Sequence, residues 1–144
     1  MASFNGDNYG SYVAVPQEQL PVGEVSGKVR VAIDSYTCTQ NVYAIADVIL
    51  MGAPLPKGAR IIDAKVISPS LGTTGIVDFG YPTDVDYFVT QADAGGQAVK
   101  KHMASEAGLL VKLSAALQPQ IRFSEASDAA NGLVIQTMIQ YVLE

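Results

Sequence analysis

The stretch from Leu55 to Gly96 constrains the fold of this 144-residue chain more than any other part of the sequence. It contains LPKGARIIDAKVIS, a glycine-broken apolar run and FGYPTDVDYFVTQADAGG, an order typical of consecutive β-strands separated by tight turns. A two-residue period runs through residues 61–66. We therefore expect Ile62, Ala64 and Val66 to face a core, with Ile61 in the opposite row.

The same alternation predicts further strands along the chain. An apolar row of Val29, Val31 and Ile33 indicates a half-buried strand over residues 28–36. Residues 41–51 and 109–117 alternate in the same way, although the composition of 41–51 also allows a short helix. In 120–126 we expect Ile121 and Phe123 to face inward, whereas 98–108 fit either a short helix or a polar strand. The longest pattern is the last, with Leu133, Ile135, Thr137, Ile139, Tyr141 and Leu143 on one face. About eight short strands predict an all-β fold, an antiparallel β-sandwich of the jelly-roll kind.

Two parts of unequal character divide the chain. Residues 1–27 hold six glycines and prolines, no Lys or Arg and little apolar periodicity, so we expect an extended N-terminal arm. Residues 28–144 form the predicted sandwich domain. The arm is either a disordered terminus or a segment that drapes over a neighbouring subunit and inserts aromatic or apolar side chains into its grooves. The residues for the second interpretation are Phe4, Tyr9, Tyr12 and Val13.

Composition narrows the classes of partner. The chain is 49% hydrophobic and only 16% charged, which predicts that part of its surface is covered by another subunit or protein. The net charge of -5 argues against nucleic acid or an anionic membrane as a partner. No signal peptide or apolar span is recognisable, so we expect synthesis in the cytoplasm. Cys38 is the one cysteine, and we expect a buried thiol without a disulfide.

Few residues offer chemistry. His102 is the one histidine, flanked by lysines, and we interpret it as a surface residue. Asp84, Asp86 and Asp93 follow one another closely, and we interpret them as turn and strand-edge residues. A calcium site and a carboxylate pair of the glycosidase type are the alternatives for the same aspartates. We expect no enzyme activity, no catalytic residue and no cofactor.

Read together, LPKGARIIDAKVIS, FGYPTDVDYFVTQADAGG and a final strand that follows ANG and ends in IQYV resemble a known family. They are similar to small head decoration, or cement, proteins of tailed bacteriophages. The resemblance implies a non-enzymatic protein on the outer surface of the virion, usually a homotrimer. It also implies that the protein stabilises the assembled capsid by bridging subunits of the major capsid protein.

The interface residues follow from a general property of tyrosine, whose ring buries area while its hydroxyl stays hydrated. We therefore expect Tyr36 and Tyr43, together with the aromatic residues of the arm, to contact partners. Three other functions stay open at this stage. They are a component of a phage tail or fibre, a carbohydrate-binding module with acidic loops around Asp84 and Asp93, and a small hydrolase that uses Asp84 or Asp86.

Overall fold

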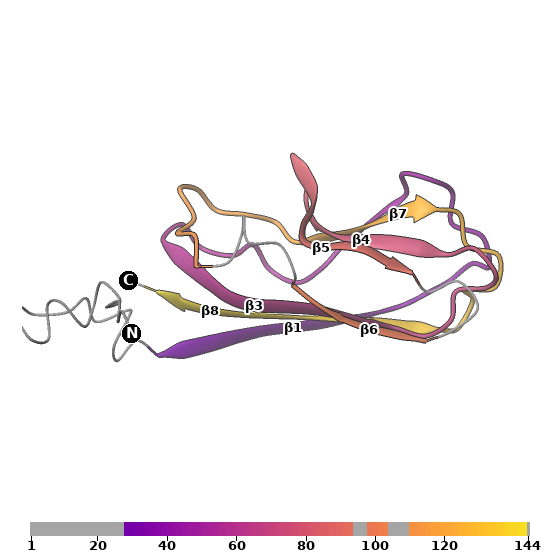
Figure 1. Cartoon of the computed structure of the whole chain (residues 1–144), viewed down its shortest axis with the longest axis horizontal. Coiled ribbons are helices and arrows are strands. Elements are labelled where there is room, and N and C mark those ends of the chain that lie inside the picture. Colours follow the sequence, from indigo (N-terminus) through magenta and orange to yellow (C-terminus); the bar gives the residue numbers. More distant parts are fainter. Residues whose placement is uncertain (1–27, 94–97, 104–109, 144) are drawn as a thin grey trace, which may run out of the picture.

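Two four-stranded antiparallel sheets pack face to face in this protein (Figure 1). The computed structural model describes residues 28–93, 98–103 and 110–143, and no helix occurs among them. The first sheet has the order β1 (Val29–Thr37), β8 (Val134–Leu143), β3 (Ala59–Ser68) and β6 (Val99–His102). The second has the order β2 (Val48–Leu50), β7 (Gln120–Glu125), β4 (Ile76–Tyr81) and β5 (Asp84–Asp93). The predicted all-β sandwich is confirmed.

The strand order is that of a jelly roll. The antiparallel pairs β1 with β8, β2 with β7, β3 with β6 and β4 with β5 would lie along one long hairpin. Rolling this hairpin up brings β8 beside β3 and β7 beside β4, which completes the two sheets. The residues of the predicted arm, 1–27, lie outside the described residues.

The core fills the space between the two sheets. In β8, Ile135, Thr137 and Ile139 are buried, and in β7 the inward residues are Ile121 and Phe123, as the alternation predicts. Aromatic rings make up much of the core volume. The largest buried rings are those of Phe79, Phe88 and Phe123, with Tyr43 stacked on Phe123 at a centroid distance of 4.7 Å.

A β-bulge in β3 overturns one predicted row. The register between β3 and β8 shifts between Ile61 and Asp63, which leaves Ile62 as the extra residue. Ile61 is therefore buried in the same layer as Ala64 and Val66, while Ile62 is only half-buried. The expectation that Ile62 faces the core and Ile61 faces away was wrong, because a bulge exchanges the two faces of a strand and leaves no mark in the alternation.

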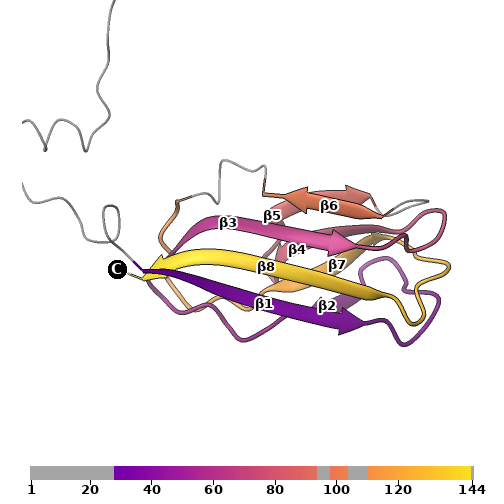
Figure 2. The same ribbon diagram turned by 90° about the horizontal axis from the view of Figure 1, so that it is seen from below.

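The apolar row of β1 also faces the other way. Val29, Val31 and Ile33 are exposed, with Ile33 at 71%, while Ala32 and Tyr36 pack against the core. The predicted burial of this row is contradicted. β1 lies at the edge of its sheet and pairs with β8 alone among the described residues, so core contact is limited to its inner row (Figure 2).

Two predicted strands are replaced by irregular chain. Residues 42–47 form a turn in which the Ala44 N–H donates to the Asp47 carboxylate and Ala46 has a φ of 74°. Only Val48–Leu50 of that segment is a strand. Within 109–117, residues 110–117 form loops and isolated bridges that bury Leu113 and Leu117. Of the undecided segment 98–108, residues Val99–His102 form a strand.

Candidate functional site

Tyr36 and Tyr43 lie together at the end of β1. Tyr43 is only 5% exposed, and its hydroxyl lies 3.1 Å from that of Tyr36 and accepts a hydrogen bond from the Thr39 N–H at 3.0 Å. Cys38 is buried beside them, where burial raises the pKa of its thiol and a hydrogen bond with Tyr43 partly offsets this rise. The predicted buried thiol is confirmed. Tyr43 belongs to the core of its own chain, which leaves little of its ring for a partner.

The three aspartates considered for calcium do not converge. Asp84 and Asp93 are the first and last residues of the ten-residue strand β5. Asp84 does meet Asp86: burial, then the hydrogen bond and the negative charge of Asp86, raise the pKa of the Asp84 carboxyl. Among the described residues, no group of three or more His, Cys, Asp or Glu side chains is placed to hold a metal ion.

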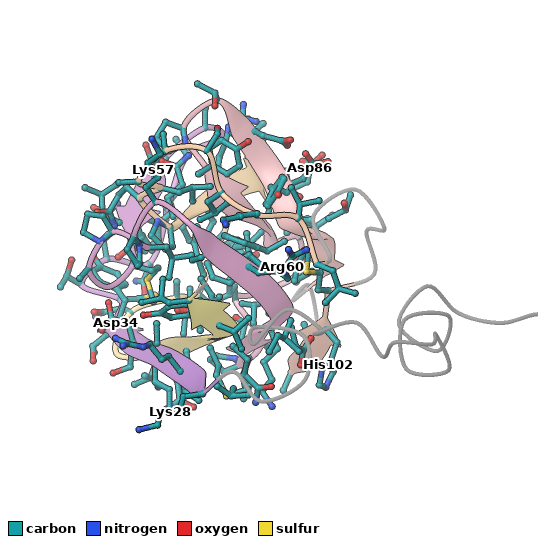
Figure 3. The ribbon with its side chains drawn as sticks, turned by 90° about the vertical axis from the view of Figure 1, so that its left-hand side faces the viewer. Lys28, Asp34, Lys57, Arg60, Asp86 and His102 are labelled. Carbon is teal, nitrogen blue, oxygen red and sulfur yellow. The ribbon has the colours of Figure 1, made fainter. Side chains whose placement is uncertain are left out.

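His102 sits on the outer face of the first sheet. Its Nδ1 lies 3.3 Å from the Asp63 carboxylate, and the imidazole is exposed, as the sequence indicates. Figure 3 places His102 and Asp86 on opposite sheets of the sandwich. The histidine and the carboxylate pair are therefore not part of one site, and this arrangement offers no partner for acid and base chemistry between them.

The most distinctive surface is apolar and lies along one edge of the sandwich. The described residues include eleven large hydrophobic side chains that are exposed, and seven of them fall between Val29 and Leu50. We call this surface the β1–β2 edge, since both edge strands run along it (Figure 2). Its members are Val29, Val31, Ile33, Val42, Ile45, Val48 and Leu50. The three on β1 lie on the outer side of the first sheet, whereas Val48 and Leu50, on either side of the buried Ile49, lie on the outer side of the second.

Sequence reasoning missed the β1–β2 edge because it took Val29, Val31 and Ile33 for a buried row. The other row of β1 contains Arg30, Ala32, Asp34 and Tyr36. Because a core-facing row seldom contains two charged residues, this composition favoured the wrong row, and the sequence carried no signal for the reversal. Asp34 is accommodated there because its carboxylate accepts hydrogen bonds from the N–H groups of Ser35 and Gly52.

Two grooves accompany these surfaces. One, of about 290 Å³, opens between β1 and the loop 51–55 and is lined by residues that include Ala32, Met51, Leu55 and Ile139. The other, of about 700 Å³, lies between the β4–β5 hairpin and residues 111–118. The rings of Tyr81 and Tyr87 meet edge to face in its wall, 5.0 Å apart. Both grooves have the mainly apolar walls of sites that receive side chains.

Charge is divided unequally between the sheets. The strands of the first sheet contain five basic residues against two acidic ones. The strands of the second contain one basic residue against five acidic ones. The strands of the two sheets therefore differ in the sign of their net charge.

The described residues thus form a two-sheet jelly roll with exposed apolar residues on the edge strand β1. No helix that could cross a membrane occurs among them. No family model and no curated protein matches the sequence. Solved structures do match the fold. A chain of the cyanophage Pam1 capsid aligns with a TM-score of 0.75 and 19% identity, covering 100% of both chains.

Two further capsids contain the same fold. A chain of the Ralstonia phage GP4 capsid aligns with a TM-score of 0.68 and 19% identity, over 88% of this chain and 92% of the other. A chain of the acid-stable capsid of Helicobacter pylori bacteriophage KHP30 aligns at 0.51 and 17%, over 80% and 87%. The resemblance to phage virion proteins that the sequence indicates is confirmed at the level of the fold. This likeness does not distinguish a decoration protein from other capsid chains.

Proposed function

We propose that this chain is a structural protein of a phage virion that binds the outer surface of the assembled capsid and stabilises it. The observation that supports this most is the fold, which extends over the full length of both this chain and a chain of the Pam1 capsid. The proposed partners are further copies of the chain, in a homotrimer, and the major capsid protein, whose subunits it bridges. Because proteins of one fold can have different functions, the exposed surface of the sandwich is the second support for this role.

The β1 part of the β1–β2 edge supplies a surface for such contacts. Val29, Val31 and Ile33 form a row of exposed aliphatic side chains on β1, and exposed apolar patches mark interaction sites. Each copy adds the same contact, so an oligomer on a symmetric shell multiplies a modest affinity. Of the predicted interface residues, Tyr36 is half-buried and Phe4, Tyr9, Tyr12 and Val13 lie outside the described residues. We retain these five as proposed contacts.

The proposal assigns no catalytic step to the chain. The groups that acid and base chemistry would use are separated, since His102 pairs with Asp63 on one sheet and Asp84 pairs with Asp86 on the other. The apolar character of the exposed edge favours binding by surface area instead.

Rebinding to stripped shells tests the proposal. Shells of the phage that encodes the chain, freed of this protein, should recover it from solution in a stoichiometric and saturable way, measured by co-sedimentation. The recovered shells should also resist heat better than bare shells. Deletion of residues 1–26 should weaken the rebinding while the circular dichroism spectrum stays that of a folded sandwich. Failure of the intact oligomer to bind bare shells would overturn the proposal.

A further inference from the structure

Of the four edge strands in the two sheets, β1 is the one suited to accept another strand. β2 and β6 have three and four residues, which gives an added strand few hydrogen bonds. β5 has ten residues, but its register to β4 shifts twice and Asp84 and Asp93 stand at its ends. β1 pairs with β8 through nine consecutive positions without a shift. Long, regular edges with an exposed apolar row are those to which extended segments add.

The surroundings of β1 define the chemistry of the segment that would add to it. On the outer face, Val31 and Ile33 are exposed, so aliphatic side chains at alternate positions of the added strand would pack against them. On the inner side, the groove between β1 and the loop 51–55 has room for a side chain of the added strand. Lys28 and Arg30 are exposed at the start of β1, so the segment should also be free of basic residues. The occupant is therefore an extended, aliphatic and acidic segment.

The arm of the same protein has this chemistry. Residues 1–27 contain Asp7, Glu18 and Glu24 and no Lys or Arg. Within them, SYVAV at residues 11–15 alternates, with Val13 and Val15 on one side and Tyr12 and Ala14 on the other. In a strand added to β1, the two valines would extend the outer row of Val31 and Ile33. Tyr12 or Ala14 would then be directed toward the groove.

We propose that residues 11–15 of one copy add as a fifth strand to β1 of a second copy. The choice of a second copy rests on the proposed function, which requires copies of the chain to be joined. The contact is heterologous, with arm on one side and edge on the other, so three copies can close it into a ring. It covers Val31 and Ile33 with an uncharged segment, and Asp7 and Glu18, which flank that segment in the sequence, bring negative charge toward Lys28 and Arg30.

Disulfide trapping between full-length chains tests the assignment. Two differently tagged chains are co-purified, one with cysteine at a single position from 12 to 15 and the other with Ile33→Cys. Cys38 is 1% exposed and stays in place, and Cys38→Ala versions control for it. At one or two of the four arm positions, mild oxidation should form a disulfide that links the two differently tagged chains. Leu50→Cys, at an equally exposed site on β2, should not become joined to the arm.

Each other result of the trapping contradicts the proposal. A third chain that carries both the arm cysteine and Ile33→Cys tests contact within one chain: a disulfide that forms only within this chain, and never between the two tagged chains, means that each arm covers its own β1. Ile33→Cys chains that join to each other mean that two copies pair through β1 directly. Absence of any product at all four arm positions means that this segment does not reach β1.

Oligomer dissociation gives an independent measurement. Ile33→Glu should raise the dissociation constant of the oligomer roughly tenfold or more, because the change removes the burial of an aliphatic side chain. Leu50→Glu should leave the constant within about threefold of the parent. Added salt should weaken the parent oligomer, since it screens the arm from Lys28 and Arg30. Equal effects of the two Glu variants would overturn the assignment.

The trapping needs no capsid, so its outcome is separate from that of the proposed function. If the two tags are joined but the oligomer fails to bind stripped shells, the capsid role is lost and the arm contact stands. If shells bind the protein but no disulfide links the two tagged chains, the arm contact is lost and the capsid role stands.

Discussion

At the scale of single residues, two carboxylates have opposite effects on stability as the pH changes. Burial and the neighbouring Asp86 raise the pKa of Asp84, while hydrogen bonds from the Thr73 hydroxyl and N–H, both 2.7 Å long, lower the pKa of Asp128. A raised folded-state pKa favours the folded state when the carboxyl is protonated, and a lowered one favours it when the carboxyl is ionised.

Replacement of Asp84 should stabilise the protein at neutral pH. Its folded-state pKa lies above the unfolded value, so the stability it contributes is present below the unfolded pKa of about 4 and is lost as the pH rises through the folded pKa. Asp84→Asn should therefore unfold at a higher urea concentration than the parent at pH 7. The advantage should vanish near pH 3.5. An equal advantage at both pH values would mean that charge is not the cause.

Replacement of Asp128 should do the opposite. Its folded-state pKa is lowered, so its contribution is present above the unfolded pKa and is lost as the pH falls through the folded value. Asp128→Asn should unfold at a lower urea concentration than the parent at pH 7, and the two should converge at acidic pH. The carboxylate is fully exposed, so we expect a small effect. A more stable variant at pH 7 would contradict the assignment of these hydrogen bonds.

At the scale of elements, β1 and β3 place identical side chains in opposite surroundings. Ile61 is fully buried beside the bulge of β3, whereas Ile33 on the edge strand is 71% exposed. Burial, not β-propensity, sets the cost of truncating such a side chain, because a cavity forms only where neighbours surround it.

The same substitution at both sites measures this difference. Ile61→Ala should lower the free energy of unfolding by about 2–5 kcal/mol, the range for deletion of a buried aliphatic side chain. Ile33→Ala should change it by less than about 1 kcal/mol, as is usual at exposed positions. Urea denaturation of monomeric protein, at low concentration, measures both. Similar costs would mean that β1 packs its outer row within the monomer.

At the scale of the whole molecule, the jelly-roll order ties the two sheets into one folding unit. Except for β4 and β5, consecutive strands lie in different sheets, and β8, at the end of the described chain, lies between β1 and β3. Neither sheet contains a continuous piece of sequence that holds its core alone. We therefore expect one cooperative transition.

Variants in the two sheets should reveal this coupling. Ile61→Ala lies in the first sheet, and Phe123→Ala, which removes a fully buried ring and should cost about 3–5 kcal/mol, lies in the second. In each variant, near-ultraviolet circular dichroism of the tyrosines and far-ultraviolet circular dichroism of the backbone should give the same lowered midpoint. Separate midpoints for the two signals would contradict a single cooperative transition.

The sequence by itself determined the class of fold and many of its parts. Alternation correctly placed the buried rows of β7 and β8, because an element in contact with the core on one side must repeat every two residues. It also indicated a buried Cys38, an exposed His102 and the resemblance to phage virion proteins that the fold comparison bears out.

Tertiary structure alone decided which apolar rows are inside. The bulge at Ile62 reverses the faces of β3, and the edge position of β1 leaves Val31 and Ile33 exposed, although both strands alternate regularly. Periodicity reports that a strand has two different faces, but the neighbours it meets in the sheet determine which face is covered. The candidate site arose from that choice: β1 has a neighbour on one side only, so its aliphatic row forms a surface instead of a core.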